Sequence, residues 1–123
     1  MKKILIVEDN EQIAKLEQIS LTQSGFNVEV IKDGNKAQER IQRENFDLLI
    51  LDVMIPGVTG FELAQIARQS MGYGVKIIMV SGILQGTDVS ESRIRMKADA
   101  DAFLNKPFQM KDLVTKVKDL LAD

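Results

Sequence analysis

The sequence predicts an α/β fold, in which a single doubly wound (βα)5 domain over residues 1–123 is built on a central five-stranded parallel sheet. Short aliphatic runs alternate five times with amphipathic stretches of about helical length, and this alternation is typical of βαβ units. Most of the aliphatic runs are continuously apolar, as expected for strands that helices cover on both faces. A chain of 123 residues, 45% of them hydrophobic, is also long enough to bury one core.

Five strands are predicted from the aliphatic runs. They span residues 4–7, 27–31, 48–51, 75–80 and 102–104. The run over 48–51, Leu-Leu-Ile-Leu, is continuous and predicts a strand that is buried on both faces. The run over 27–31 alternates polar and apolar residues, so we expect it at an edge of the sheet.

A predicted helix follows each predicted strand. The five helices span residues 11–24, 35–44, 60–70, 88–97 and 109–121. The last is the clearest, because apolar residues from Met110 to Leu121 recur at helical spacing, whereas the stretch over 88–97 has few of them. Gly25 is predicted to cap the first helix, and Asp33-Gly34 to form a turn before the second.

Composition and charge exclude several classes of function. The chain has no Cys, which excludes disulfides and thiolate metal sites, and no His, which excludes Ser-His-Asp hydrolysis and His-liganded zinc. The net charge is −2 and no basic stripe is present, so we expect no direct nucleic-acid binding. The apolar run after Lys2 and Lys3 is too short for a signal peptide or a membrane span. We therefore expect a cytoplasmic protein without membrane contact.

Polar residues follow four of the five predicted strands. These are Glu8 and Asp9, then Asp52, then Ser81, and finally the segment Asn105-Lys106-Pro107. In an open doubly wound sheet the carboxyl ends of the strands meet at one edge, where ligands bind. Each residue alone would most simply be a helix cap or a surface residue. Together they predict that three acids, a hydroxyl group and an amine converge on one site.

This set of groups suits phosphoryl transfer. Clustered carboxylates repel one another unless a cation neutralises them, and Mg²⁺ prefers a site made of oxygen ligands. A carboxylate beside such an ion can attack phosphorus and give an acyl phosphate, while the ion and a lysine neutralise the charge of the transferring group. A hydroxyl group can then hydrogen-bond to a phosphoryl oxygen.

Four segments carry a resemblance to a known family. They read ILIVEDN, DLLILDVMIPGVTGFEL, IIMVSG and AFLNKPF, and they occur in this order along the chain. Over its full length, the chain resembles the response regulator receiver domain of bacterial two-component signalling. The resemblance implies a flavodoxin-like sheet of strand order 2-1-3-4-5. It also implies a signalling domain that catalyses only its own phosphorylation and autodephosphorylation.

The resemblance assigns the phosphoacceptor and the metal ligands to particular residues. Asp52 would receive a phosphoryl group from the phosphohistidine of a histidine kinase or from a phosphotransfer protein. Asp9 and Asp52 would bind Mg²⁺ directly, with Mn²⁺ as the alternative ion. Glu8 would reach the ion through water, and the backbone carbonyl of Met54 would complete the protein ligands.

The resemblance also implies a conformational switch. Ser81 would close on the phosphoryl group beside Lys106, and Lys106–Pro107 would be a cis peptide bond. Movement of Ser81 would leave space into which Phe103, at the position of the family's switch aromatic residue, can rotate.

The output surface implied by the switch is the face formed by residues 88–97, 102–104 and 109–121. A downstream protein or an output domain would bind this face in only one state, and so sense the phosphate by differential affinity. A phosphorylation-dependent homodimer is a further partner that such a face could serve.

Some residues depart from the family pattern. The segment from Ser81 to Lys106 is a few residues longer than usual, and Asp99 replaces a common Gly. Met54 and Ile83 are apolar and flank the expected phosphoryl site, so we expect them to slow autodephosphorylation by limiting access of water. The sequence stops after the last predicted helix, so we expect no output domain, whether the chain is a stand-alone receiver or a piece of a larger regulator.

Three alternative functions fit the sequence less well. A Mg²⁺-dependent phosphatase of the haloacid dehalogenase type also uses an aspartyl nucleophile, but it needs an acid two residues later, where this chain has Met54. A flavodoxin-like nucleotide or flavin domain would need glycines or hydroxyl groups after the first strand, whereas VEDNEQ supplies two acids. A docking scaffold without chemistry is disfavoured because every expected site residue is present.

Overall fold

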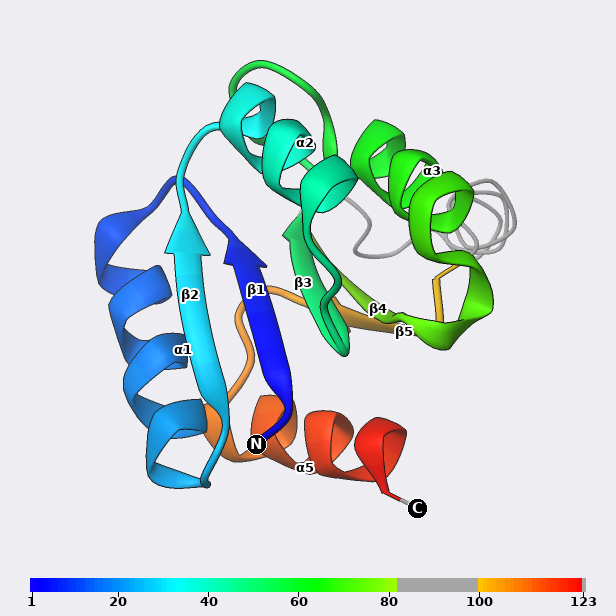
Figure 1. The fold of residues 1–123 in the computed structure, drawn as a ribbon. Coiled ribbons are helices and arrows are strands. Elements are labelled where there is room, and N and C mark those ends of the chain that lie inside the picture. Colours follow the sequence, from blue (N-terminus) through cyan, green and yellow to red (C-terminus); the bar gives the residue numbers. More distant parts are fainter. Residues whose placement is uncertain (82–99, 123) are drawn as a thin grey trace.

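Five parallel strands form the centre of the molecule in the computed structural model, which describes residues 1–81 and 100–122 (Figure 1). The strands are β1 Lys3–Val7, β2 Asn27–Ile31, β3 Leu48–Asp52, β4 Lys76–Ser81 and β5 Ala102–Asn105. Their order in the sheet is β2-β1-β3-β4-β5, so the predicted parallel sheet and its strand order are confirmed. The prediction that the second strand lies at an edge is also confirmed.

Helices cover both faces of the sheet. They are α1 Glu11–Gln23, α2 Gly34–Arg43, α3 Gly60–Met71 and α5 Met110–Leu121, and a short 3-10 helix, η1, spans Gly72–Gly74. α1 and α5 lie on one side of the sheet, and α2 and α3 lie on the other (Figure 1). The helix predicted over 88–97 lies outside the described residues. No helix among the described residues is both long and apolar enough to cross a membrane.

Side chains at the helix ends fix where two of the helices begin. The Asn10 side chain accepts hydrogen bonds from the backbone N–H groups of Gln12 and Ile13, both at 3.0 Å, and so caps α1. Thr59 caps α3 in the same way, since its hydroxyl oxygen accepts from the Glu62 N–H at 3.3 Å. These caps satisfy N–H groups that have no partner within the helix, so the sequence itself sets both starting points.

Two glycines shape the connections around β2. Gly25 has a φ of 98° and donates its N–H to the Thr22 carbonyl, so the prediction that it ends the first helix is confirmed. The predicted Asp33-Gly34 turn is wrong in its position. Asp33 caps α2, because its side chain accepts from the Asn35 N–H at 2.8 Å, and Gly34 is the first residue of the helix.

Parallel pairing brings the carboxyl ends of all the strands to one edge of the sheet, called the rim below. One row of paired residues crosses the sheet, and it consists of Ile31, Val7, Leu51, Met79 and Phe103. The residues that follow this row on each strand therefore lie at the same height. The rim is where the polar residues predicted from the sequence come together.

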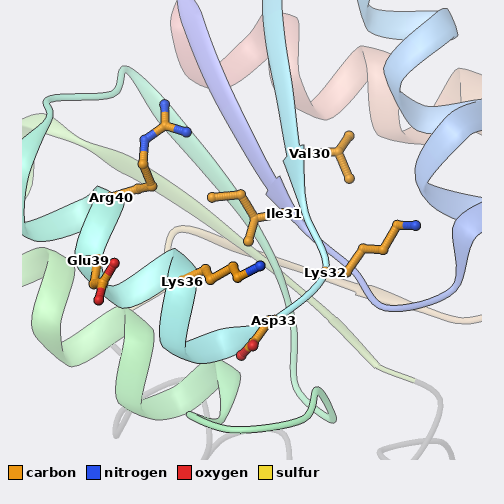
Figure 2. Close-up of a pocket in the computed structure, with 7 residues that line it drawn as sticks. All are labelled: Val30, Ile31, Lys32, Asp33, Lys36, Glu39 and Arg40. Carbon is orange, nitrogen blue, oxygen red and sulfur yellow. The ribbon is translucent and has the colours of Figure 1, made fainter.

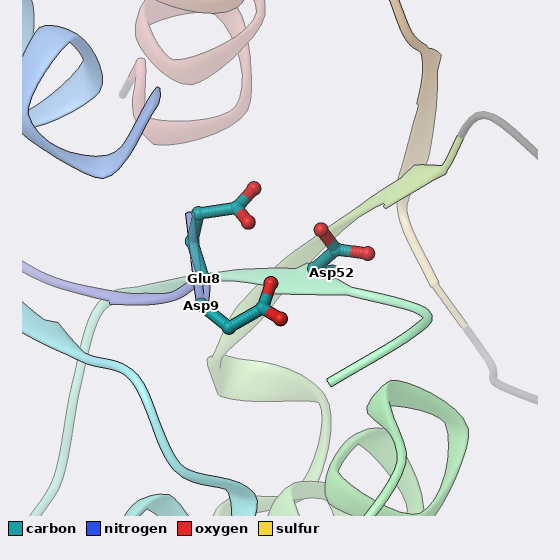
Figure 3. Close-up of side chains that lie close together, drawn as sticks. All are labelled: Glu8, Asp9 and Asp52. Carbon is teal, nitrogen blue, oxygen red and sulfur yellow. The ribbon is translucent and has the colours of Figure 1, made fainter. Parts of the chain in front are cut away.

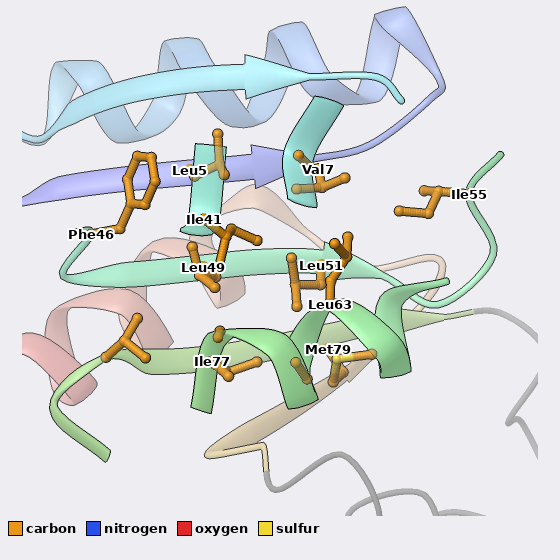
Figure 4. Close-up of a cluster of buried hydrophobic side chains, with 14 of the residues drawn as sticks. Leu5, Val7, Ile41, Phe46, Leu49, Leu51, Ile55, Leu63, Ile77 and Met79 are labelled. Carbon is orange, nitrogen blue, oxygen red and sulfur yellow. The ribbon is translucent and has the colours of Figure 1, made fainter. Parts of the chain in front are cut away.

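Alternate strand residues form two buried clusters, one on each face. The cluster on the α2 and α3 side includes Leu5, Val7, Leu49, Leu51, Ile77 and Met79 (Figure 4). The cluster on the α1 and α5 side includes Ile4, Ile6, Leu48, Ile50, Ile78 and Val80, with Leu21, Leu113 and Val117 from the helices. Full burial of one such side chain stabilises the fold by about 1.5 to 3 kcal/mol. Together the clusters hold the strand ends, and so the rim, in a fixed arrangement.

Gly34 lies directly against the loop that follows β3. Its N–H donates to the Pro56 carbonyl at 2.9 Å, and a Cβ at this position would lie 2.6 Å from the Val58 nitrogen and closer still to the Val58 carbonyl oxygen. We expect Gly34→Ala to lower the free energy of unfolding by about 3 kcal/mol, because backbone atoms must move. Urea unfolding measures this change.

A second glycine provides the control for that experiment. A Cβ at Gly74 would meet nothing within 4 Å, so Gly74→Ala is expected to change the unfolding free energy by no more than about 0.5 kcal/mol. Equal losses of stability in the two variants would contradict the close backbone contact at Gly34.

Candidate functional site

Three carboxyl groups converge at the rim. Glu8 and Asp9 directly follow β1, and Asp52 is the last residue of β3. One carboxylate oxygen from each of the three residues lies within 4.8 Å of the others. Figure 3 shows the three side chains gathered together. Glu8 and Asp52 are buried, and Asp9 is exposed, so solvent reaches the cluster at Asp9.

Lys106 joins two of these carboxylates. It follows β5, and its Nζ donates hydrogen bonds to Glu8 Oε1 at 3.0 Å and to Asp52 Oδ2 at 2.6 Å. Burial opposes the charged form of the lysine, but the hydrogen bonds to Asp52 and Glu8 outweigh it and raise the pKa of Lys106 above its ordinary value. The ammonium group is therefore a fixed positive charge of the site. The Lys106–Pro107 peptide bond is cis, as the resemblance implied.

Backbone groups orient both buried carboxylates. Asp52 Oδ1 accepts a hydrogen bond from the Met54 N–H at 3.0 Å, and Glu8 Oε2 accepts one from the Asn10 N–H at 3.1 Å. Burial raises the pKa of Glu8 above its ordinary value, opposed by the hydrogen bonds from Asn10 and Lys106 and reinforced by the charge of Asp52. The two carboxylates are thus held in position by the chain before any ligand arrives.

The charges of the cluster do not balance. Among the residues that the structure describes, three carboxylates cluster beside the ammonium of Lys106, and this excess of negative charge favours a cation. The available ligands are all oxygens, which hard divalent ions such as Mg²⁺ prefer. The residues present therefore fit a divalent cation at the rim.

The start of α3 lies close to the backbone of Asp52. A Cβ at Gly60 would approach the carbonyl oxygen of Asp52 more closely than real Cβ atoms do, and the Gly60 N–H donates to the Val53 carbonyl at 3.3 Å. Gly57, in the same loop, has a φ of 89°. These two glycines let the chain turn sharply after β3 and leave the Asp52 carboxylate at the rim.

Comparison with known proteins identifies the family. A family model described as the response regulator receiver domain matches residues 4–118. The chain belongs to this family. The haloacid dehalogenase alternative consequently has no support.

Individual relatives of this receiver domain agree with the family match. The DNA-binding response regulator MtrA of Mycolicibacterium paratuberculosis is 32% identical over 117 residues, which cover 95% of this chain and 50% of that protein. A CheY-like receiver domain protein from Methanospirillum hungatei has a TM-score of 0.86 at 32% identity, covering 97% of this chain and 92% of its own.

A putative response regulator from Chloroflexus aurantiacus also has a TM-score of 0.86 at 32% identity, covering 99% and 98% of the two chains. The receiver domain spans about half the length of the curated relatives that it matches.

The structure places the other expected residues of the receiver domain at or near the rim. Ser81 is buried as the last residue of β4, and its carbonyl accepts the Lys106 N–H at 3.1 Å, so the two residues are neighbours. Phe103 lies in β5 beside Met79 and packs, partly buried, against the cluster on the α2 and α3 side. The Met54 side chain is 63% exposed. Ile83 and Asp99 lie outside the described residues.

Glu17 is a buried acidic residue that the sequence patterns did not lead us to predict. It lies on the core-facing side of α1 between Ala14 and Leu21, and its side chain is buried. Neither carboxyl oxygen has a hydrogen-bond partner within the described part of the chain. The spacing of the three residues at i, i+3 and i+7 is the signal that could have placed Glu17 on the buried face.

The burial of Glu17 changes its acidity. Burial above all, with the charges of Glu8 and Asp52, raises the pKa of Glu17 from 4.5 to about 8, and Lys106 opposes this rise. Glu17 is therefore largely protonated at neutral pH. The charged groups that reach it are the same three groups that form the Lys106 ion pairs.

A separate hollow of about 530 Å³ lies away from the carboxylates, between β2 and the start of α2 (Figure 2). Its cations include Lys32, which pairs with Glu11, and Arg40, which pairs with Glu29 and Glu44. Because Lys32 and Arg40 already have carboxylate partners, these two cations attract an anion less strongly, and Lys36 is the other lysine of the lining. The rim remains the better candidate for the functional site.

Proposed function

We propose that this receiver domain accepts a phosphoryl group on Asp52 from the phosphohistidine of a histidine kinase or of a phosphotransfer protein. The observation that carries the proposal is the position of the Asp52 carboxylate, which lies between the Lys106 ammonium and the acids Glu8 and Asp9. An aspartate that ends a buried strand beside a lysine and two further acids has the charge arrangement that phosphoryl transfer requires.

Asp9 and Asp52 would bind Mg²⁺, or Mn²⁺ in its place, with Glu8 contributing through water and Met54 through its backbone carbonyl. Such an ion neutralises charge on the phosphoryl group. The oxygen-only donor set supports this assignment. Met54 is also tied to the site directly, because its N–H holds Asp52 Oδ1.

In the proposed reaction a carboxylate oxygen of Asp52 forms a bond to phosphorus. The bond between phosphorus and the imidazole nitrogen of the donor breaks, and the nitrogen keeps the electron pair of that bond. Lys106 stabilises the negative charge of the phosphoryl oxygens, because its ammonium already contacts the attacking carboxylate at 2.6 Å. Ser81, beside Lys106 at the end of β4, would hydrogen-bond to the transferred group.

We propose that phosphorylation changes the shape of the surface that the domain presents to its partners. Ser81 moves toward the phosphoryl group, and Phe103 turns into the space that it leaves. The face over β5 and α5 would then bind a downstream protein, an output domain or a second copy of this chain in one state only, and the helix predicted over 88–97 as part of this face lies outside the described residues. The net charge of −2 supports output through protein contacts and not through direct binding of nucleic acid.

Exposure to phosphoramidate or acetyl phosphate with Mg²⁺ tests the acceptor assignment. We expect intact-mass measurement to show a single labile phosphoryl adduct on the unchanged protein and none on Asp52→Asn, which lacks the nucleophile. Asp119→Asn, at an exposed position on α5, is the matched control and should form the adduct normally. An adduct that survives in Asp52→Asn would refute the assignment.

A further inference from the structure

Asp47 and Asp101 occupy equivalent places in the sheet, each directly before a strand. Asp47 precedes β3, and its N–H donates to the Lys3 carbonyl at 2.8 Å while the Lys3 N–H donates to Asp47 Oδ2 at 2.7 Å. Asp101 precedes β5, and its N–H donates to the Ile77 carbonyl at 2.9 Å while the Ile77 N–H donates to Asp101 Oδ2 at 2.8 Å. Each aspartate thus makes two reciprocal hydrogen bonds with the backbone of a neighbouring strand. We call these two arrangements the register clamps.

Burial alone does not fix the register of β3 or of β5. β3 is buried along its whole length and its apolar side chains face both clusters, so a slip by one residue would still place apolar side chains on each face. β5 has four residues and pairs with β4 at the edge of the sheet. A slip by two residues would leave each of its side chains on the same face, because strand side chains alternate with a period of two. Specific polar contacts are therefore needed to fix both registers.

The register clamps supply these contacts. A slip would take the Asp101 carboxylate away from the Ile77 N–H and from Arg68 of α3, whose Nη2 donates to Asp101 Oδ2 at 2.9 Å. Asp47 is also tied to the strand on its other side, because its carbonyl accepts the Lys76 N–H at 3.0 Å. Hydrogen bonds to ionised carboxylates are among the stronger ones in proteins, so each clamp opposes a slip of its strand.

Each register clamp lies five residues before a charged group of the rim. Asp52 follows Asp47 by five residues, and Lys106 follows Asp101 by the same number. β4 lies between β3 and β5, so the relative height of the two groups depends on both registers. A parallel strand rises about 3.3 Å per residue, so a slip by two residues would move either group by about 6.6 Å. Such a displacement would break the 2.6 Å contact between Lys106 Nζ and Asp52 Oδ2.

We propose that Asp47 and Asp101 are positioning residues of the acceptor site, which set the heights of Asp52 and Lys106 at the rim by fixing the registers of β3 and β5. Neither aspartate contacts the transferred group, because both lie at the ends of their strands that are opposite to the rim. The effect on phosphoryl transfer rests on the proposed function of the rim, whereas the effect on the ion pair between Lys106 and Asp52 does not.

Alanine and asparagine variants of both aspartates test the proposal. Asp47→Ala and Asp101→Ala remove the oxygen that accepts the N–H of the neighbouring strand, so we expect each to form the phosphoramidate adduct about tenfold more slowly than the unchanged protein. Asp47→Asn and Asp101→Asn keep an oxygen acceptor at the same place, so their rates should stay within about twofold of the unchanged rate. Intact mass gives the initial rates, under conditions where urea unfolding shows each variant to be folded.

Mg²⁺ binding distinguishes a change of register from a general loss of structure. Asp101→Ala displaces Lys106 and leaves the three carboxylates in place, so it should bind Mg²⁺ at least as tightly as the unchanged protein. Asp47→Ala displaces Asp52 from Asp9, so it should bind Mg²⁺ about tenfold more weakly. Calorimetric titration measures both affinities. An equal decrease in the two variants would indicate a general loss of structure and would overturn the proposal.

The reactivity of the Lys106 amine reports on the ion pair without any phosphoryl chemistry. Acylation requires the neutral amine, so an ammonium that is paired with carboxylates is acylated slowly. We expect acetic anhydride to modify Lys106 about threefold faster in Asp101→Ala than in the unchanged protein or in Asp101→Asn, as measured by peptide mass. Asp119→Ala, which removes an exposed carboxyl group of α5, is the matched control and should change none of the three measurements.

The proposal fails if the alanine variants keep the unchanged rates of adduct formation and acetylation, or if the asparagine variants are as slow in transfer as the alanine variants. If an alanine variant does not fold, Asp47→Glu or Asp101→Glu takes its place, because glutamate keeps the charge but moves the carboxylate by one methylene group. The glutamate variant should transfer more slowly than the asparagine variant, and the reverse order would show that charge matters and the clamp does not.

These outcomes also separate the register clamps from the proposed function. If the unchanged protein forms the adduct and the alanine variants form it equally fast, only the role of the clamps is refuted. If the unchanged protein forms no adduct and binds no Mg²⁺, the proposed function fails, and the acetylation rates of Lys106 alone decide whether the clamps hold the ion pair.

Discussion

The Lys106→Met variant is expected to accept a phosphoryl group from phosphoramidate about 100-fold or more slowly than the unchanged protein. The substitution keeps most of the side-chain volume and removes the ammonium that lies 2.6 Å from Asp52 Oδ2 and 3.0 Å from Glu8 Oε1. Without it, the positive charge that neutralises the phosphoryl oxygens as the new bond forms is lost. The initial rate of adduct formation, followed by intact mass, measures the effect.

Mg²⁺ binding distinguishes a loss of chemistry from a loss of structure in this variant. The ammonium and the ion are both positive and share Asp52, so Lys106→Met should bind Mg²⁺ at least as tightly as the unchanged protein. Lys32→Met, which removes an exposed lysine paired with Glu11, should leave both measurements unchanged. A normal rate of adduct formation in Lys106→Met would show that the lysine has no part in the transfer.

The second large effect is a dependence of the free energy of unfolding on pH, and it arises from the Glu17 carboxyl group. The pKa of this carboxyl group is about 8 in the folded protein and near 4.5 when the chain is unfolded and solvated. Between these values the folded state binds more protons than the unfolded state, so stability decreases as pH rises through this window. Each pH unit corresponds to about 1.4 kcal/mol, so Glu17 is expected to destabilise the fold by about 3 kcal/mol at pH 7 relative to pH 4.5.

Glu17→Gln removes this dependence because an amide does not titrate. We expect the stability difference between Glu17→Gln and the unchanged protein to shift by about 3 kcal/mol in favour of the variant between pH 4.5 and pH 7, and to level off above pH 8. Urea unfolding at a series of pH values measures the difference, and the other acids cancel because both proteins contain them. A constant difference across this range would show that Glu17 is not a buried acid.

Much of the fold follows from local sequence patterns. Continuous aliphatic runs such as 48–51 can be buried on both faces only within a covered parallel sheet, and this requirement determined the strands. Within residues 1–81 and 100–122, the strand and helix bounds differ from the predicted ones by only a residue or two, as for Asp52 and Ser81, which end their strands. Sequence spacing does not define such ends, because they depend on hydrogen bonds with neighbouring strands.

The position of Gly34 and the burial of Glu17 could not be predicted with the same ease. Gly34 begins α2 because the loop after β3 packs against it, a contact between segments distant in the sequence. In α1 the apolar residues Leu16 and Ile19 are 54% and 44% exposed, while Glu17 between them is buried. Two spacings compete along α1, because Leu16 and Ile19 favour one face while Ala14, Glu17 and Leu21 favour another, and the packing of α1 on the rest of the fold decides between them.

The acids at the rim were predicted to converge because parallel strands end on the same edge of a sheet. Their spacing within 4.8 Å and the shared ammonium of Lys106 are consequences of strand register, which the sequence does not state. The roles of Asp52, Asp9 and Ser81 are inferred from the family resemblance, and the proposed experiments test them.

The ion pairs of Lys106 join segments that are far apart in the sequence. Glu8 and Lys106 are separated by 98 residues and Asp52 and Lys106 by 54, and β5, which brings the lysine, is at the edge of the sheet. Contacts between such distant segments lose the most chain entropy on closure. A folding intermediate that pairs only β1, β2 and β3 would gather the three acids without their ammonium. The amount of phosphoryl adduct formed at Asp52 would therefore measure the fraction of molecules that are completely folded. Its rate of appearance during refolding would follow the last step of folding.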